Sequence, residues 1–378
     1  MLSVINELKQ ANPEAPLEVW FICDKGYAKQ AAALLRHAIV PIEFKAIFAG
    51  KLRRYHGQTW FQRLTDVATI FYNVRDIALL SMGFVQSFYM LLRVRPDVVF
   101  TKGGFVCVPV GLAAAALGIP LVIHDSDTIP GLTNRFLARF ASAIATGASL
   151  DNYNYPAARS HYVGIPINPI FSPITDTKRA EYKRELGYDP DKPLILITGG
   201  GTGSVLVNKA VADYAPRLVA KAQIVHLTGT GKAEQVEHSV DQQLSGVSRR
   251  DYHVIPFLDK QMPATILAAD VVVTRAGATT LLELAAAGAA CVIVPNPYLT
   301  EGHQLKNAKV YTERQAATVI DERGLLEQPA LLADAIEQLI DDAGLRQTYR
   351  KTIVSLAKPD AARDVARLIR RASSGYES

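Results

Sequence analysis

A run of glycines in the second half of the sequence, Gly199–Gly203, has the composition of a phosphate-binding turn. It follows the apolar stretch Leu194–Thr198, which predicts a buried strand, and precedes a predicted helix. Glycines let a backbone approach phosphate closely, and the start of a helix presents free N–H groups and a positive dipole end. The arrangement predicts a diphosphate cradle, although such turns also close sheets for structural reasons alone. It lacks the acidic residue of a dinucleotide fingerprint and the Lys-Ser/Thr pair of a P-loop.

A second turn of small residues, Arg275–Ala278, follows the apolar strand Val271–Thr274. A helix is predicted to begin at Thr279, with its N–H groups directed at the ligand-binding edge of the sheet. Glu283 lies one turn into that helix, where its carboxylate can accept two hydrogen bonds from a ribose diol. The alternative for Glu283 is an acidic residue that complements the helix dipole.

Imidazole and amide side chains open another predicted helix after the next strand, at His303, Gln304 and Asn307. Such groups form hydrogen bonds with sugar hydroxyls. Taken alone, His303 would be interpreted as a solvated surface histidine, but its neighbours favour a sugar-binding interpretation.

Polar and glycine residues also follow two predicted strands in the first half of the chain. They are Gly103, Gly104, His124, Asp125, Asp127 and Asn134. Doubly wound domains bind ligands at the carboxyl ends of their strands, so these residues are candidates for a second binding surface. The acidic pair Asp125 and Asp127 also fits a metal site, but without a further acidic residue nearby it is better explained as polar turn chemistry.

Short apolar strands alternate with helical patterns along the chain, which is typical of parallel α/β sheets. The predicted strands are Leu17–Cys23, Ile42–Ile47, Asp97–Thr101, Leu121–His124, Leu194–Thr198, Gln223–Leu227, His253–Pro256, Val271–Thr274, Cys291–Pro295 and Thr318–Asp321. Pro166 and Pro169 preclude a helix and favour a linker. We therefore predict an N-terminal domain over residues 1–165, joined by a C-terminal helix over residues 360–372, and a second domain over residues 166–358.

The beginning of the sequence lacks two parts that a doubly wound domain normally has. Leu2, Ile5 and Leu8 share one helical face, so residues 1–9 are predicted to form a helix with no strand and no glycine-rich turn ahead of it. Because the first strand of such a domain is central, its loss would leave a gap in the middle of the sheet. Two explanations stay open: a misplaced start codon or a fragment, and a split enzyme whose missing piece comes from another chain.

Composition and charge narrow the class of protein. The 378 residues exceed what one hydrophobic core usually covers, and 49% apolar residues exclude bulk disorder. Three widely spaced cysteines support neither a disulfide framework nor a zinc site, which favours a reducing cytoplasm. The net charge of +5 arises within residues 1–165, where 16 Lys/Arg stand against 11 Asp/Glu. That bias suits an anionic membrane surface or a pyrophosphate-bearing partner, and no aromatic-interleaved basic motif favours nucleic acid.

Residues 70–94 predict a long apolar helix. Its least charged run, Ile77–Leu92, has 16 residues, fewer than the roughly 20 that cross a bilayer. Burial on a sheet and a membrane-docking edge are both open, and both can hold because a helix has two faces. Nearby residues that would help docking are Lys51, Arg53, Arg54, Trp60, Arg63 and Arg75.

Taken together in chain order, these motifs resemble the MurG family of glycosyltransferases, within glycosyltransferase family 28. The resemblance covers nearly the whole chain and depends on Gly103–Phe105, His124–Asp125, Pro130–Asn134, Gly199–Gly203, Pro256–Asp259, Arg275–Thr279, Glu283–Gly288 and His303–Ala308. It implies a GT-B fold, with two Rossmann-like, doubly wound domains and a crevice between them. It also implies a peripheral enzyme of peptidoglycan synthesis on the cytoplasmic face of the bacterial inner membrane, with other cell-wall synthesis proteins as candidate partners.

The resemblance also implies an activity. The family moves N-acetylglucosamine from UDP-N-acetylglucosamine to the 4-hydroxyl of the muramyl sugar of undecaprenyl-linked lipid I, giving lipid II with inversion at the anomeric carbon. Neither a cofactor nor a divalent metal is expected. The backbone at Leu258 would pair with uracil, Glu283 would hold the ribose, and the glycine turn would hold the diphosphate. The implied donor-binding residues are Gly200, Gly201, Thr202, Gly203, Leu258, Arg275, Gly277, Ala278, Thr279, Glu283, His303 and Gln304, and the implied acceptor-binding residues are Gly103, Gly104, His124, Asp125, Asp127 and Asn134.

The sequence departs from the family pattern at several positions. The histidine that is the family's usual candidate base would lie ahead of Met1, so no base is assigned and the chain alone is predicted to be inactive or weak. Gly201 stands where a serine usually meets the donor phosphate, with Thr202 as its substitute. The remaining departures are Asn168 for an arginine, Asp125-Ser126-Asp127 for a Glu-Gln-Asn pattern, and His303 for a glutamine.

Three alternative functions stay open. A lipid glycosyltransferase of the same fold, such as a diacylglycerol glycosyltransferase, would differ in its acceptor. A UDP-sugar epimerase shares the two-domain frame but needs no membrane surface. A non-catalytic remnant would bind a UDP-sugar without transferring it.

Overall fold

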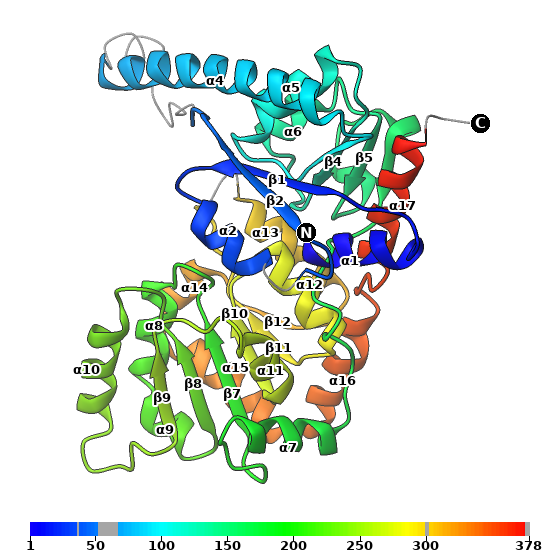
Figure 1. Cartoon of the computed structure of the whole chain (residues 1–378). Coiled ribbons are helices and arrows are strands. Elements are labelled where there is room, and N and C mark those ends of the chain that lie inside the picture. Colours follow the sequence, from blue (N-terminus) through cyan, green and yellow to red (C-terminus); the bar gives the residue numbers. More distant parts are fainter. Residues whose placement is uncertain (36–37, 52–66, 299–301, 375–378) are drawn as a thin grey trace. The chain divides into compact units, whose positions relative to one another are not determined.

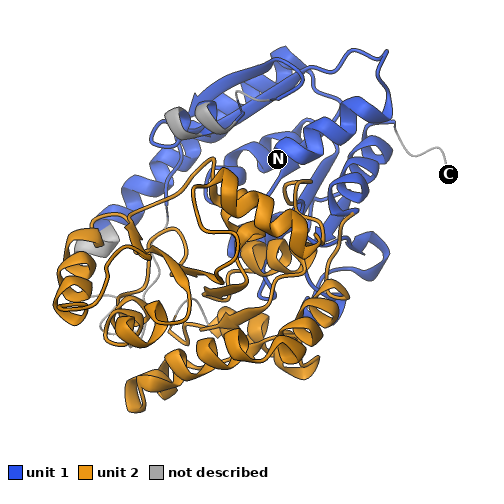
Figure 2. Ribbon diagram, turned by 90° about the horizontal axis from the view of Figure 1, so that it is seen from below, with its two compact units in different colours: residues 1–166, 360–378 blue, residues 167–359 orange. Residues whose placement is uncertain are grey.

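The computed structural model describes residues 1–35, 38–51, 67–298 and 302–374, and it divides into two compact units. Unit 1 comprises residues 1–166 and 360–378, and unit 2 comprises residues 167–359 (Figure 2). Unit 1 is therefore built from both ends of the chain, whereas unit 2 is one continuous stretch.

Unit 2 contains a six-stranded parallel sheet in the order β12-β11-β10-β7-β8-β9. Its strands are β7 (Leu194–Thr198), β8 (Gln223–Leu227), β9 (Tyr252–Ile255), β10 (Val271–Thr274), β11 (Cys291–Ile293) and β12 (Thr318–Val319). The first strand of the unit, β7, is central, as in a doubly wound domain. All six strands are predicted by the apolar runs of the sequence, with boundaries that differ by a few residues.

Side chains of the central strand alternate between two cores, one on each face of the sheet. Leu194 and Leu196 join the first core, Ile195 and Ile197 join the second, and all four are fully buried. Helices cover both faces (Figure 1), which explains why the strands are continuous apolar runs. The helices are α7 (Asp176–Glu185), α8 (Val205–Ala212), α9 (Ala215–Val219), α10 (Ala233–Gln243), α11 (Met262–Ala268), α12 (Ala278–Ala287), α13 (His303–Glu313), α14 (Glu322–Glu327), α15 (Ala330–Asp341) and α16 (Ala343–Val354).

The strand order of this sheet reverses between β7 and β10, which is where open α/β sheets bind ligands. The register of the two strands pairs Thr198 with Thr274. Because adjacent strands lie about 4.8 Å apart, the turns that follow these two residues start side by side.

Unit 1 contains two separate parallel sheets among its described residues. The smaller sheet pairs β1 (Val19–Asp24) with β2 (Ile42–Ile47), and the larger has the order β3-β4-β5-β6. The strands of the larger sheet are β3 (Val99–Thr101), β4 (Leu121–Asp125), β5 (Ala143–Thr146) and β6 (Ser160–Tyr162). The helices are α1 (Leu2–Ala11), α2 (Ala28–Leu35), α4 (Val67–Val94), α5 (Cys107–Ala116), α6 (Leu132–Leu137) and α17 (Ala361–Ser373), with short 3-10 turns η1 (Leu150–Asn152) and η2 (Ala157–Arg159).

No described strand joins β1 to β3, and five of the six residues of β1 are only half-buried. A doubly wound order would place a central strand between these two. The gap predicted in the middle of the first sheet therefore has a counterpart in the structure, while the explanation for that gap stays a prediction.

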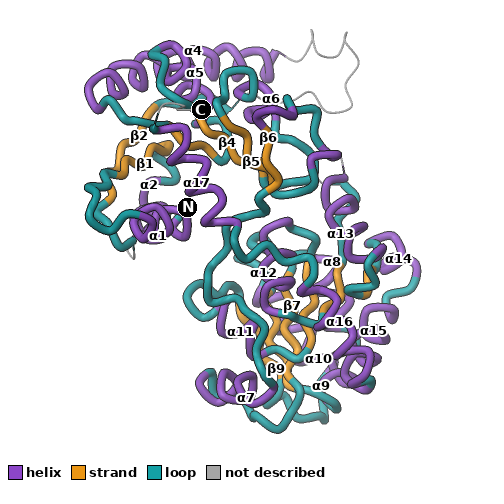
Figure 3. Tube along the Cα trace, turned by 90° about the vertical axis from the view of Figure 1, so that its right-hand side faces the viewer, coloured by secondary structure: helices purple, strands orange, loops and turns teal. Residues whose placement is uncertain are grey.

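The C-terminal helix α17 lies beside α1 in unit 1 (Figure 3). Val365, Leu368 and Ile369 of α17 share one hydrophobic core with Val4 of α1 and Val122 of β4. The last helix of the chain thus completes the core of the unit that contains the first.

Helix α4 runs beside α5 and presents two different faces (Figure 1). Phe84, Phe88 and Leu91 pack into the core, and Gln86 Oε1 accepts a hydrogen bond from Phe48 N at 2.9 Å. The opposite face exposes Phe71, Val74, Ile77, Met82, Val85, Tyr89 and Leu92. The stretch Phe71–Val94 is long and apolar enough to cross a membrane, a property it shares with core helices of other proteins, and 17% of its apolar window is buried.

Two of the cationic residues proposed to help membrane docking are described. Lys51 is exposed, and Arg75 forms an ion pair with Asp76 at 2.9 Å. The other docking candidates lie outside the described residues, namely Arg53, Arg54, Trp60 and Arg63.

Candidate functional site

The glycine turn after β7 is shaped by its contact with the loop after β8. Gly203 has a φ of +71°, and a Cβ there would lie 1.9 Å from Thr228 O. Gly229 has a φ of +88°, and a Cβ there would lie 2.5 Å from Thr202 O. The two backbones meet where no side chain fits, which explains the glycine at both positions.

The outer part of the turn is open to a ligand. A Cβ at Gly200 or Gly201 would meet nothing within 4 Å, and both residues are exposed. Helix α8 follows at Ser204, whose hydroxyl accepts a hydrogen bond from Val207 N at 3.3 Å. The other first-turn N–H groups of α8 and its positive dipole end face the same edge of the sheet.

Lys232 is a candidate that sequence reasoning missed. It is the N-cap residue of α10, and its Nζ donates a hydrogen bond to Thr202 O at 2.5 Å. An ammonium on the glycine turn adds positive potential to that of the helix starts. In the sequence it is only a lysine shortly after Gly229. The pairing of β7 with β8 brings the loop that carries this lysine next to the glycine turn.

A buried hydrogen-bond network supports these two loops. Asn208 Nδ2 donates to Thr228 O at 2.9 Å, and Asn208 Oδ1 lies 3.1 Å from His226 Nε2. His226 Nδ1 lies 2.8 Å from the Tyr252 hydroxyl oxygen. Burial lowers the pKa of His226 to about 3, so the ring is neutral at physiological pH and serves as a rigid link between its partners.

The turn after β10 leads into a helix that has no side-chain cap. Gly277 is the N-cap residue of α12, so the N–H groups of Ala278 and Thr279 stay available to a ligand. Asn307 Nδ2, on α13, donates to Ala276 O at 3.0 Å and holds the turn in place.

The Arg275 side chain is engaged by Glu322 of α14. Its Nη1 lies 2.5 Å from Glu322 Oε1, and the two side chains are 12% and 9% exposed. Burial lowers the pKa of Arg275 and raises the pKa of Glu322. Because Glu322 balances the charge, Arg275 fixes the shape of the turn more than it adds positive potential to it.

Glu283 is a half-buried carboxylate on α12. Burial raises its pKa from 4.5 to about 7, and among the described residues no charge or hydrogen bond offsets that effect. A carboxylate in this state favours a ligand that donates hydroxyl or N–H hydrogen bonds to it. The predicted ribose contact fits this requirement.

The remaining donor-side candidates lie at the same carboxyl edge. Gln304 is 7% exposed, and its Oε1 accepts a hydrogen bond from Asn296 N at 2.9 Å. His303 is half-buried beside it at the start of α13, and half-buried Leu258 lies in the loop after β9. The structure thus gathers the predicted donor-binding residues on loops and helix starts of one sheet.

In unit 1, His124 is part of the core. It is fully buried on β4, with Nε2 at 2.8 Å from Gly164 O and Nδ1 at 3.3 Å from Ser126 Oγ. Burial lowers its pKa to about 3, and Lys102 adds to that effect. With both ring nitrogens engaged, His124 positions its neighbours instead of facing a ligand.

Asp125 and Asn134 lie together at the end of β4. Asp125 Oδ2 accepts hydrogen bonds from the Tyr155 hydroxyl at 2.7 Å and from Gly131 N at 3.2 Å. Burial nevertheless raises the pKa of Asp125 to about 6. Asn134 Nδ2 donates to His124 O at 3.0 Å, and the Asn134 side chain also forms a hydrogen bond with Asp125, while its buried Oδ1 has no described partner.

The turn after β3 touches Asn134. Gly103 and Gly104 adopt φ values of +84° and +93°, and a Cβ at Gly103 would lie 3.1 Å from Asn134 Nδ2. Asp127 is half-buried, and its backbone oxygen accepts a hydrogen bond from the Tyr153 hydroxyl at 2.6 Å. The described part of the chain contains no group of three or more His, Cys, Asp or Glu side chains arranged to hold a metal ion.

Two family models match the chain. The glycosyltransferase family 28 N-terminal domain matches residues 1–146, and the glycosyltransferase family 28 C-terminal domain matches residues 194–365. A curated relative from Natranaerobius thermophilus is 30% identical over 374 residues, which cover 97% of this chain and 94% of the relative. The chain belongs to glycosyltransferase family 28.

That relative is named UDP-N-acetylglucosamine--N-acetylmuramyl-(pentapeptide) pyrophosphoryl-undecaprenol N-acetylglucosamine transferase. A relative of the same name from Halalkalibacterium halodurans is 32% identical over 98% of this chain and 94% of its own length. Another, from Bacillus subtilis, is 34% identical over 77% of this chain and 78% of its own length. The resemblance to the MurG family stated from the motifs is confirmed.

Solved structures agree with this membership. The crystal structure of Acinetobacter baumannii MurG is 26% identical, with a TM-score of 0.68 over 98% of this chain and 94% of that one. A UDP-GlcNAc 2-epimerase from Neisseria meningitidis, bound to UDP-GlcNAc, has a TM-score of 0.66 over 98% of this chain and 96% of that one. Its sequence identity is only 12%, so this similarity shows the fold alone. The predicted GT-B fold is confirmed.

We predict that Tyr155→Phe raises the pKa of Asp125 above its value of about 6. The hydroxyl stabilises the charged carboxylate, so its removal favours the protonated form and shifts the titration midpoint upward by about one pH unit. Carboxyl carbon chemical shifts in an NMR pH titration measure this change. Tyr188→Phe in unit 2 is the control, and an unchanged midpoint in Tyr155→Phe would contradict the assigned hydrogen bond.

Proposed function

We propose that the chain transfers N-acetylglucosamine from UDP-N-acetylglucosamine to the 4-hydroxyl of the muramyl sugar of undecaprenyl-linked lipid I. The product is lipid II, which serves peptidoglycan synthesis. The observation that carries the proposal is the 30–32% identity with curated transferases over 97–98% of the chain. The gathering of a glycine turn, an uncapped helix start and Glu283 at one sheet edge supports it.

The leaving diphosphate would lie between the turn Gly199–Gly203 and the start of α12. Negative charge builds on it as its bond to the anomeric carbon breaks, and the attacking hydroxyl inverts the configuration of that carbon. The dipoles and N–H groups of α8 and α12 are directed at this charge, and Lys232 adds an ammonium. This mechanism does not call on a divalent metal.

The nucleoside and sugar would contact the loops on either side of the diphosphate. Backbone groups at Leu258 would pair with uracil, and the Glu283 carboxylate would accept hydrogen bonds from both ribose hydroxyls. Gln304 lies at the start of α13, and its Oε1 accepts a hydrogen bond from Asn296 N. Gln304 and its neighbour His303 would contact the sugar hydroxyls.

The acceptor would contact the ends of β3 and β4 in unit 1. Gly103 and Gly104 would form that surface, beside the Asn134 side chain, which is 2% exposed. Asp125 and Asp127 would flank that contact. No general base is assigned among the described residues.

Product analysis tests the proposed function. The chain is incubated with radiolabelled UDP-N-acetylglucosamine and vesicles that contain either lipid I or diacylglycerol, and the lipids are then separated. Label is expected in a disaccharide-bearing product of lipid I, at enzyme concentrations high enough to detect slow turnover. Label in diacylglycerol alone would favour the other lipid glycosyltransferase, a 2-epimerised UDP-sugar would favour an epimerase, and UDP binding without any product would favour the remnant.

We predict that UDP binds more tightly as the pH rises through about 7, the pKa of Glu283. The ribose hydroxyls stabilise the ionised carboxylate and lower its pKa in the complex, so binding releases a proton. Affinity therefore increases by up to about tenfold between roughly pH 6 and pH 8 and then levels off. Calorimetry measures this dependence.

Glu283→Gln isolates this carboxylate from the ionisation of UDP itself. The variant is expected to lose the extra pH dependence and to bind UDP about tenfold more weakly at high pH. Glu327→Gln, exposed on α14, is the control and binds like the unmodified chain. Wild-type affinity in Glu283→Gln across the pH range would remove Glu283 from the donor site.

Peripheral attachment to the cytoplasmic face of the bacterial inner membrane, through the exposed face of α4, is part of the same proposal. The inner face of α4 packs into the core and bonds Phe48, which supports a helix that lies in the interface plane instead of crossing the bilayer. The positive excess of residues 1–165 suits anionic lipid headgroups.

Val85→Glu is expected to weaken vesicle binding about tenfold, because it replaces an apolar contact with a charge. Val85 is 51% exposed on α4, and Val247 in unit 2 is 47% exposed and serves as the matched site for Val247→Glu. Co-sedimentation with phosphatidylglycerol-containing vesicles measures binding, and thermal unfolding checks that both variants fold. Equal sedimentation of the two variants would speak against α4 as the docking face.

A further inference from the structure

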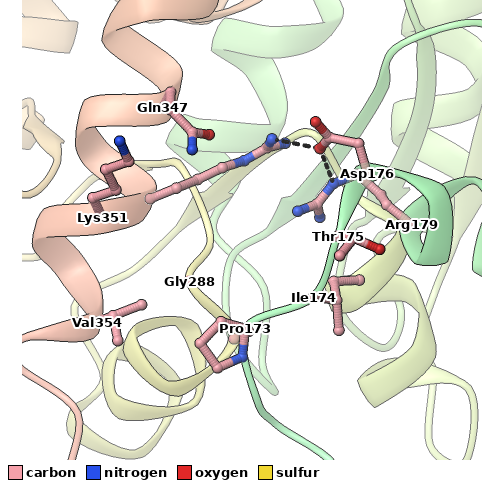
Figure 4. Close-up of a pocket in the computed structure, with 11 residues that line it drawn as sticks. Pro173, Ile174, Thr175, Asp176, Arg179, Gly288, Gln347, Lys351 and Val354 are labelled. Atoms are coloured by element: carbon pink, nitrogen blue, oxygen red, sulfur yellow. Dashed lines mark hydrogen bonds and ion pairs between the residues drawn. The ribbon is translucent and has the colours of Figure 1, made fainter.

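A cavity of 560 Å³ lies in unit 2, away from the edge proposed for the donor. Its walls are the segment Pro173–Asp176, the end of α12 at Ala287–Gly288, and α16 (Figure 4). Arg179 lines it, and Arg179 Nη1 donates to Leu267 O at 2.8 Å and to Ala269 O at 2.9 Å, immediately ahead of β10. The cavity is therefore at the amino ends of the strands, whereas the glycine turn is at their carboxyl ends.

Two arginines and two aspartates meet beside this cavity. Arg350 Nη1 lies 2.9 Å from Asp176 Oδ1, and Arg350 Nη2 lies 3.4 Å from Asp270 Oδ1. Arg179 Nε lies 3.6 Å from Asp176 Oδ1 and 3.8 Å from Asp270 Oδ1, which is too far for a hydrogen bond. The aspartates therefore satisfy the guanidinium groups only in part.

Positive charge exceeds negative charge at this place. Lys183 Nζ lies 2.7 Å from Asp270 Oδ2 and balances that carboxylate by itself. Of the residues that line the cavity, Arg179, Arg350 and Lys351 are cationic and Asp176 is the one acid. An excess of about two positive charges is left for an external anion to neutralise.

The two guanidinium groups also have unused donors. Arg179 is 5% exposed, and neither its Nε nor that of Arg350 has a hydrogen-bond partner among the described residues. Burial, with the nearby Arg350 as second cause, lowers the pKa of Arg179 to about 10. A buried cation in this state is stabilised by an anion placed next to it.

Asp176 marks the position at which such an anion would lie. Its side chain is 81% exposed and lies beside Arg179 (Figure 4), and its Oδ1 lies 3.6 Å from Arg179 Nε and 2.9 Å from Arg350 Nη1. The carboxylate can turn into solvent when another anion takes its place beside the two guanidinium groups. Guanidinium groups form charge-assisted hydrogen bonds with phosphate oxygens, and α7 begins beside them at Asp176.

We propose that this cavity is a second ligand site of unit 2, and that it binds a small phosphorylated molecule. Arg179, Arg350 and Lys351 hold the phosphate once Asp176 has turned aside. The rest of the ligand packs against the less polar wall formed by Pro173, Ile174 and Val354. The volume is within the range of roughly 300–1,000 Å³ that small-molecule sites occupy.

Calorimetry with inorganic phosphate as the probe tests this site in the full chain. Asp176→Asn removes the internal competitor and is expected to tighten binding about threefold, whereas Lys351→Gln weakens it about threefold. Both residues are exposed, and thermal unfolding checks that both variants fold, because Asp176 pairs with the buried Arg179 and Arg350. Lys309→Gln, exposed on α13, is the matched control and leaves the affinity unchanged.

The two variants are expected to change the phosphate affinity in opposite directions, and this difference decides the test. Identical phosphate affinity in Asp176→Asn, Lys351→Gln and the unmodified chain would locate phosphate elsewhere, such as at the glycine turn, and would overturn the proposal. Weaker binding in Asp176→Asn, or no measurable binding at all, would also overturn it. Transfer to lipid I is measured in a separate experiment. A negative result at the phosphate site therefore does not affect the proposed transferase function, and a negative transferase assay does not affect the phosphate site.

Discussion

The pairing of β7 with β10 is the constraint on which the candidate donor site depends. Thr198 and Thr274 are partners in the register, and each is followed at once by a turn and the start of a helix. A slip of one residue would carry one turn about 3.3 Å past the other, and the two helix starts would lose their common target. Packing prevents that slip, because alternate side chains of both strands fill separate cores on the two faces.

The charges of the residues at this edge determine which of them can attract an anion. Glu322 balances Arg275, which leaves the helix starts and Lys232 as the sources of positive potential. Glu283 stands half-buried without a described partner, so a ligand that donates hydrogen bonds satisfies it best. Positive potential for an anion and a carboxylate for hydroxyl groups are the two features that a sugar nucleotide combines.

Sequence patterns predicted the six-stranded sheet of unit 2 well because its four central strands are buried on both faces. Runs such as Leu194–Thr198 and Val271–Thr274 are apolar throughout, and the turns after them carry the glycines that a close backbone approach requires. In unit 1, β5 and β6 escaped prediction. The first has only four residues, half of them alanine, and the second has three residues without apolar alternation.

The parts of the site that sequence could not predict depend on contacts between distant segments. Lys232 acquires its role from the neighbouring strand, and Arg275 is engaged by a glutamate 47 positions away. His124 has the composition of a ligand-binding residue, yet its place on a central strand buries it against Gly164. No local pattern encodes these three outcomes, because each is decided by which elements become neighbours.

The way unit 1 draws on both ends of the chain has a consequence for biosynthesis. Residues 167–359 leave the ribosome before α17 does, so unit 2 has every strand of its sheet while the apolar surface around Val4 and Val122 is still uncovered. The N-terminal part of unit 1 therefore cannot complete its core until the last helix has been translated. A premature stop codon ahead of Ala361 would thus harm the half of the molecule that was made first.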